Sequence, residues 1–183
     1  MKKILMTFAA VAALLSSAAC KPEDKPEEDT FDHFEFRSGL NYSKDVTDNF
    51  DFTYDILSNG VSVASGTMSG DLKPVEVKSG IKEGTLDVHF SFKAKDSFYK
   101  TWDIWKEYVI SIDSFIALYA IDRKGPEQQL FQIGFSFKDA TYSTFLESKI
   151  PEVIALMEDA LAIDETFTIV KDETGKYIVL YKN

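Results

Sequence analysis

Three residues whose types could support hydrolytic chemistry stand at alternate positions of one segment: Asp87, His89 and Ser91. An acid, an imidazole and a hydroxyl are the groups of a catalytic triad, in which each must reach the next by a hydrogen bond. The surrounding residues alternate between apolar and polar, which predicts a strand, and side chains two apart on a strand lie about 6.6 Å from one another. That spacing is too long for direct hydrogen bonds, so we expect an exposed polar face at this position.

Residues that bind metal ions are scarce or poorly spaced. Cys20 is the only cysteine and the chain has two histidines, which leave little from which to build a zinc site. Asp45, Asp48, Asn49 and Asp51 offer the oxygen ligands that calcium prefers, but their spacing matches no EF-hand loop. We therefore expect no metal ion and no cofactor.

The most informative cluster is aromatic and comprises Phe98, Tyr99, Trp102 and Trp105. Exposed indole rings beside acidic and amide groups suit sugars, because the ring stacks on the apolar face of a sugar. The same residue types are enriched at protein interfaces, where they act as anchors. Ordinary core packing is the third interpretation. We take these four residues as the candidate binding site and leave the three interpretations open.

The common catalytic signatures are missing from the sequence. It contains no nucleophile elbow, no phosphate-binding glycine-rich loop and no metalloprotease helix. With thirty acidic residues, a pair of carboxylates about 5–9 Å apart could still cleave a glycoside, which keeps a carboxylate-based hydrolase as a further alternative. We name no catalytic residue and expect a protein that is not an enzyme.

The N-terminus has the three parts of an export signal. A short basic segment, Met1–Lys3, precedes an apolar stretch of twelve residues from Ile4 to Leu15. This stretch is too short to span a bilayer, which takes about 20 apolar residues, but it has the length of a signal-peptide core. Small residues follow, and they suit cleavage after Ala19. We predict that residues 1–19 are a signal peptide.

The residues around this cleavage site resemble the lipobox of bacterial lipoproteins. Ser17, Ala18 and Ala19 precede Cys20, and the family carries small residues before a cysteine that becomes the acylated N-terminus. The family most often has Leu where this chain has Ser17. The resemblance implies that Cys20 is lipidated and that the mature protein is anchored in a bilayer. Ordinary secretion that leaves a free thiol is the alternative.

The segment after Cys20 reads as a tether. Residues 21–32 hold six acidic and two basic side chains, two prolines and almost no apolar residue, a composition that excludes a core. Lys21–Asp24 and Lys25–Asp29 resemble the acidic retention tags of surface lipoproteins of the Bacteroidetes, with a proline interposed in each. The resemblance implies an outer-membrane lipoprotein on the cell surface, which we favour over one on the periplasmic face.

Residues 33–183 are predicted to form one β-rich globular domain. The chain carries a formal net charge of −10, which argues against nucleic acid because a duplex binder needs a basic face. Apolar residues alternate with polar ones over several segments, and the Asn59-Gly60 pair favours a tight hairpin turn. Pro74 suggests an edge strand beside it. The predicted strands lie around residues 34–36, 50–56, 61–65, 75–77, 86–92, 107–112, 115–121, 130–137, 166–170 and 177–181.

The pattern changes to a helical period near the C-terminus. Apolar residues from Ile150 to Leu161 recur on one face, with Pro151 in the first turn, which predicts an amphipathic helix. Residues 94–106 are ambiguous, and we favour a loop or a short helix. The fold class is therefore mainly β (α+β), an antiparallel sheet or β-sandwich of about nine strands with one C-terminal helix laid across one face and a closing hairpin.

These features together predict a membrane-anchored lipoprotein whose domain is a non-enzymatic binding or assembly module of the cell envelope. Its expected partners are the bilayer, through Cys20, and an envelope protein or a glycan. The rival hypothesis is a glycan-binding accessory lipoprotein, which requires Trp102 and Trp105 to be exposed and roughly coplanar.

Overall fold

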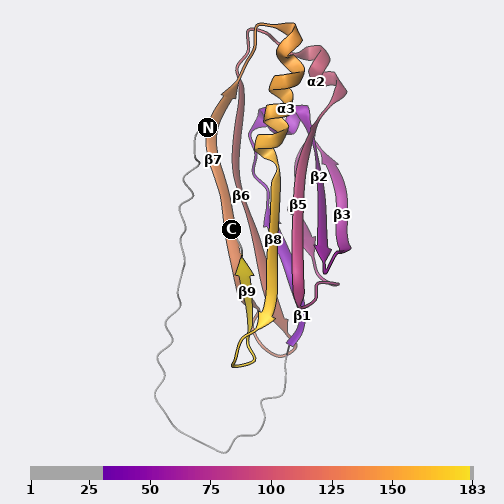
Figure 1. The fold of residues 1–183 in the computed structure, drawn as a ribbon, viewed down its shortest axis with the longest axis vertical. Coiled ribbons are helices and arrows are strands. Elements are labelled where there is room, and N and C mark those ends of the chain that lie inside the picture. Colours follow the sequence, from indigo (N-terminus) through magenta and orange to yellow (C-terminus); the bar gives the residue numbers. More distant parts are fainter. Residues whose placement is uncertain (1–30, 182–183) are drawn as a thin grey trace, which may run out of the picture.

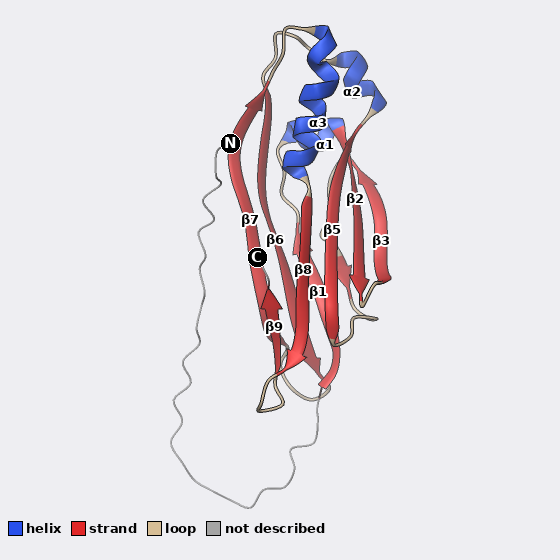
Figure 2. Ribbon diagram, in the orientation of Figure 1, coloured by secondary structure: helices blue, strands red, loops and turns tan. Residues whose placement is uncertain are grey.

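The computed structural model describes residues 31–181, which form two antiparallel sheets packed face to face (Figures 1 and 2). One sheet has the strand order β4-β1-β6-β7 and the other has the order β3-β2-β5-β8-β9. The mainly β class, the nine strands over the described residues and the closing hairpin are confirmed. The strands are β1 (Phe31–Gly39), β2 (Phe50–Ser58), β3 (Val61–Ser69), β4 (Glu76–Val77), β5 (Gly84–Ala94), β6 (Tyr108–Asp122), β7 (Gln128–Tyr142), β8 (Ile163–Lys171) and β9 (Tyr177–Tyr181).

The core lies between the sheets and is largely aromatic. The alternation that predicted the strands turns one face of each strand inward, because successive side chains point to opposite sides of a sheet. Phe36 of β1 meets Phe90 of β5 across the interface with ring centroids 6.5 Å apart, and Phe52 of β2 lies 5.2 Å from Phe90. The first contact joins the two sheets, and the second packs neighbouring rings within one sheet.

The turns and the edges follow the predicted residues. Asn59 and Gly60 both have positive φ, as the tight turn between β2 and β3 requires. The short strand β4 follows Pro74 and lies at the edge of its sheet, where a residue without a donor N–H is tolerated.

The strand β6 is longer than predicted. The sequence suggested separate strands at 107–112 and 115–121, but the structure has one strand of 15 residues. Ser114, at the predicted break, is buried and its hydroxyl accepts the Asn41 N–H at 3.3 Å. The polar residue therefore has a partner inside the sandwich and does not interrupt the strand.

The helices gather at one end of the sandwich (Figure 2). The predicted helix is confirmed as α3 (Ile150–Leu161), and Ile154, Met157 and Leu161 are its buried residues. It lies at the end of the sandwich beside β5, and not across a sheet face as expected. Two short helices, α1 (Lys44–Asn49) and α2 (Asp96–Thr101), lie at the same end, and the 3-10 turn η1 (Glu147–Lys149) leads into α3.

The domain begins slightly earlier than predicted. Phe31 and Asp32, which we assigned to the tether, belong to β1, and Phe31 pairs with Asp122 at the end of β6. Phe31 packs against Phe34 and Tyr177, with ring centroids 4.7 Å away in both cases. The predicted signal peptide, the lipobox Ser17–Ala19, Cys20 and residues 21–30 of the tether lie outside the described residues.

Candidate functional site

The structure separates the four aromatic residues that the sequence grouped. Phe98 is 1% exposed and Trp102 is 9% exposed, so both belong to the core, whereas Tyr99 is partly exposed and Trp105 is 81% exposed. Trp102 lies against Phe98 and Tyr108, with ring centroids 5.3 and 4.5 Å away. The core interpretation therefore applies to Phe98 and Trp102, and only Trp105 among the two tryptophans presents its indole to solvent.

The turn that carries Trp105 is held by several hydrogen bonds. The Asp103 carboxylate accepts the backbone N–H of Trp105 at 2.8 Å, and the Asp103 carbonyl accepts the Lys106 N–H at 3.1 Å. The Asp103 N–H in turn donates to the Tyr108 hydroxyl at 2.9 Å. Short local bonds of this kind are how an Asp side chain orders a turn. The exposed indole is thus presented on an ordered turn.

Asp45 joins this turn to the rest of the domain. Its carboxylate forms an ion pair with the Lys106 ammonium and also accepts the Val109 N–H at 2.8 Å, at the start of β6. The Lys106 ammonium lies 4.5 Å from the centre of the Tyr108 ring, within cation–π distance. Asp45, which the sequence suggested as a calcium ligand, therefore links α1 to the turn that carries Trp105.

A second loop adds two residues that the sequence analysis missed. Phe145 and Leu146, between β7 and η1, are 67% and 63% exposed, and the Phe145 ring lies 5.8 Å from the Trp105 ring. The Thr144 hydroxyl accepts the Leu146 N–H at 3.1 Å and so orders this loop. We name Trp105, Phe145 and Leu146 the apical patch. The signal in the sequence is a pair of large apolar residues inside an otherwise polar loop.

The apical patch and the N-terminus of the domain lie at opposite ends of β6. Phe31 pairs with Asp122 at the end of that strand, whereas the Trp105 turn immediately precedes Tyr108 at its beginning. A strand of 15 residues spans about 45–50 Å. The start of β1 therefore lies at the end of the sandwich opposite the helices and the Trp105 turn (Figure 1).

The polar residues considered for catalysis or metal binding are not brought together. His89 Nδ1 lies 2.7 Å from Asp164, and Asp87 accepts a hydrogen bond from the Thr166 hydroxyl at 2.7 Å, so these two residues pair across to β8. Asp48 pairs with Lys44, and Asp51 accepts the Ser69 hydroxyl. Among residues 31–181, no group of three or more His, Cys, Asp or Glu side chains could hold a metal ion.

A chain of charged side chains covers the outer face of β1 near its start. The His33 ring lies between Asp32, 2.8 Å from Nδ1, and Glu35, 3.3 Å from Nε2. The hydrogen bond to Asp32, with a smaller contribution from Glu35, raises the pKa of His33. Arg37 bridges Glu35 and Glu127 at 2.7 Å each and holds the pKa of both carboxyls below the ordinary value. The two charged partners give His33 a structural role.

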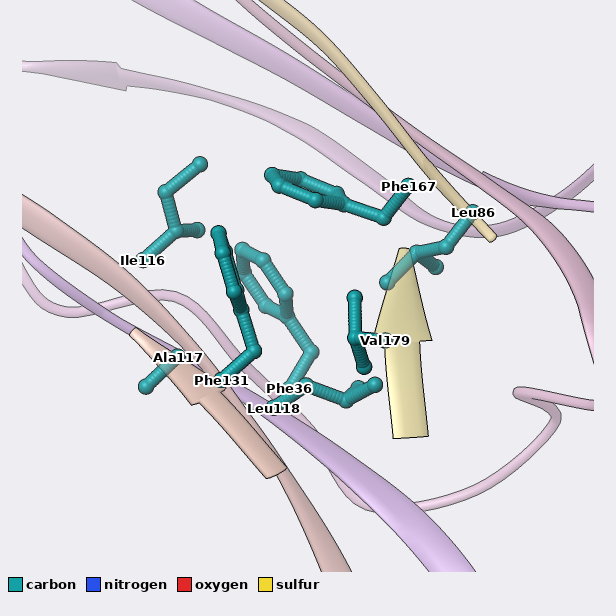
Figure 3. A pocket seen from close by; sticks show the side chains of 8 residues that line it. All are labelled: Phe36, Leu86, Ile116, Ala117, Leu118, Phe131, Phe167 and Val179. Carbon is teal, nitrogen blue, oxygen red and sulfur yellow. The ribbon is translucent and has the colours of Figure 1, made fainter. Parts of the chain in front are cut away.

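A small cavity lies between the sheets, near β9 (Figure 3). Its volume is about 10 Å³, roughly the room that one water-sized sphere needs. All of the side chains around it are hydrocarbon, and a gap of this size and lining is a packing defect of the core. The lining residues are Phe36, Leu86, Ile116, Ala117, Leu118, Phe131, Phe167 and Val179.

Compared with known proteins, the chain matches no family model, no curated protein and no solved structure. Within the part of the chain that the structure describes, no helix is both long and apolar enough to cross a membrane.

Proposed function

We propose that this protein is a lipoprotein anchored in the outer membrane through Cys20 and displayed on the cell surface, and that its domain is a non-enzymatic binding or assembly module. The lipobox residues and the acidic tether support the anchor. The apical patch supports the binding role and is the observation that carries it. The partner we propose is an envelope protein that covers Trp105, Phe145 and Leu146.

The apical patch has the properties of a protein-binding hot spot. Trp is among the residues most enriched at such spots, and clusters of exposed large apolar side chains mark interaction surfaces. Trp105 and Phe145 come from two loops that are each ordered by their own hydrogen bonds. Little conformational freedom of these loops is left to lose when a partner binds, which favours affinity.

A glycan is the second candidate partner, because an indole that is 81% exposed can stack on a sugar ring. The arrangement of two exposed, coplanar indoles that this hypothesis required is not present, since Trp102 is packed against Phe98 and Tyr108. A glycan would have to be held by Trp105 and Phe145, whose ring planes are inclined by 58°. Side chains of a protein partner can pack against two inclined rings more readily than the single apolar face of a sugar ring can.

The test is in-cell crosslinking of the full chain, with Trp105→Ala and Phe145→Ala as the variants. Leu180→Ala is the matched control, because Leu180 is also exposed but lies on β9, away from the helices. We expect a crosslinked protein that is recovered with the wild type and with Leu180→Ala, and lost with both variants of the patch. A partner that all four chains recover equally would refute the binding role of the patch.

A glycan array run with the same four chains separates the two partners. If the wild type binds a glycan, and this binding is lost in Trp105→Ala and kept in Leu180→Ala, the partner is a sugar and not a protein. No binding by any chain, together with the crosslinking pattern above, would leave the protein partner as the assignment.

A further inference from the structure

The strand β7 presents a long edge that pairs on one side only. It is the last strand of its sheet and, within residues 31–181, is hydrogen-bonded to β6 alone. The other edges are shorter. β4 has two residues and follows Pro74, β9 has five, and β3 has nine, with the chain at Gly80 packed against Val63. An unprotected edge strand is a template for pairing with another extended chain.

The middle of this edge is regular and uncharged. Pairing with β6 runs without a register shift from Phe131 to Phe137, and shifts occur only beyond each end of that segment. Phe131, Ile133 and Phe135 are half-buried on the core side, whereas Gln132, Gly134 and Ser136 are exposed on the outer side. Natural edges are commonly guarded by a charge or a proline, and this segment has neither.

Gly134 at the centre of the segment is not required by the domain's own fold. A glycine inside a strand weakens it, and it is usually explained by a bulge, a turn or the close approach of another backbone. Gly134 lies in the regular part of the ladder, and its φ is outside the left-handed region. A Cβ added there would meet only the Ser114 carbonyl, at an ordinary 3.9 Å. The domain itself gives no reason for the glycine, and the close approach of a second backbone would explain it.

We propose that β7 is a homodimer interface, in which two copies of this chain pair their β7 strands antiparallel about a two-fold axis at Gly134. In this register Ile133 lies opposite Phe135 of the second copy, and Gln132 lies opposite Ser136 of the second copy. Apolar side chains thus meet apolar ones on the core side, and polar ones meet on the outer side. The pattern of the segment is self-complementary, which indicates a second copy as the occupant.

The distribution of charge agrees with this occupant. The chain is acidic as a whole, so most of its faces would repel a second copy, but no charged residues stand opposite each other along the paired segment. Lys138, the nearest charged residue, would face Leu130 of the second copy. This inference is argued from β7 alone and does not rest on the apical patch.

The register can be tested with cysteines in the full chain, in native membranes, under a mild oxidant. Gln132→Cys combined with Ser136→Cys places two thiols of different copies opposite each other, at a separation that a disulfide can bridge. Each single variant is the matched control, because identical positions in the two copies would lie four residues apart along the strands. We expect a dimer band with the double variant only. Equal crosslinking of the single and double variants, or crosslinking to a different protein, would overturn the proposal.

Sedimentation of the full chain in detergent gives a second measurement that does not depend on thiols. Replacing both Gln132 and Ser136 by Lys places like charges opposite each other, whereas Gln132→Lys with Ser136→Glu places opposite charges together. Both positions are exposed, so both variants should fold. We expect the first pair to weaken dimerisation several-fold relative to the second. A wild-type chain that sediments as a monomer at all concentrations would refute the interface.

Discussion

Glu158 of α3 accepts the backbone N–H of Ala94 at the end of β5, at 2.8 Å. The neighbouring strand β8 pairs with β5 only from Gly84 to Phe90, so Ala94 lies beyond the ladder that β5 forms with β8. The carboxylate provides the acceptor that a continuing strand would have supplied, and it also pairs with Lys93 at 3.3 Å. This contact explains why α3 lies beside β5 at the end of the sandwich.

Removing that carboxylate should destabilise the domain. We expect Glu158→Ala to lower the free energy of unfolding by about 1–2 kcal/mol, because the Ala94 N–H loses a charged acceptor. Glu158→Gln keeps an oxygen at the same place and should cost less. Urea denaturation measures both values, and equal losses for the two variants would show that the hydrogen bond is not the cause.

The two tryptophans should respond differently to truncation. Trp102→Ala empties a core position and should cost about 3–5 kcal/mol of unfolding free energy. Trp105→Ala removes an exposed ring that contacts Phe145, and its cost should stay below about 1 kcal/mol. Urea denaturation of the two variants gives the comparison. Similar losses would mean that Trp105 is part of the core and not of a binding surface.

The turn at Asn59 should depend on both its backbone and its side chain. The side chain donates to the Glu83 carbonyl at 2.9 Å and accepts the Thr85 N–H at 2.8 Å, close beside Gly84. Asn59→Ala loses these bonds and strains the positive φ, so we expect a loss of about 2 kcal/mol. Asn59→Gly also loses these hydrogen bonds but does not strain the backbone, so we expect a smaller loss of unfolding free energy in the same urea assay. The loss that remains in Asn59→Gly measures the contribution of the side-chain hydrogen bonds.

Much of this fold could be predicted from the sequence, because local signals and tertiary structure agree. The alternation of apolar and polar residues predicted β2 and β5, and the apolar stripe predicted α3. The Asn59-Gly60 pair predicted the turn between β2 and β3. In each case the packed domain keeps the local structure that the sequence favours. The short helix α1 could not be predicted, since six residues carry too little periodicity. Its Asp45 resembles a metal ligand in sequence, and only the fold shows that it binds the Val109 N–H.

The candidate site could be predicted only in part. Trp102 and Trp105 were grouped because they are three residues apart, as on one face of a helix. The helix α2 ends at Thr101, so the two rings diverge, one into the core and one into solvent. Phe145 is forty residues away in sequence, and no local pattern connects it with Trp105. That contact depends on the register of β6 and β7, in which Tyr108 pairs with Tyr142.

The ion pairs of His33 should make stability depend on pH. The hydrogen bond to Asp32 raises the pKa of His33 in the folded state above its unfolded value of 6.5. The stabilisation is therefore complete below about pH 6.5 and is lost as pH rises through the folded pKa, because only the imidazolium donates to both Asp32 and Glu35. In urea titrations between pH 5.5 and 8.5, the stability difference between wild type and His33→Gln should shrink as pH rises. A constant difference would contradict the assignment.

Trypsin treatment of intact cells tests on which side of the outer membrane the domain lies. The turn between β6 and β7 carries Arg123 and Lys124, both exposed, and exposed turns are the preferred sites of proteolytic nicking. If the domain is displayed on the surface, trypsin should cleave there while a periplasmic protein in the same sample stays intact. The variant with Arg123→Gln and Lys124→Gln should lose that fragment, which ties the cleavage to the turn. Cleavage of the wild type only after the outer membrane is opened would place the domain in the periplasm. The partner of the apical patch would then have to be sought among periplasmic proteins.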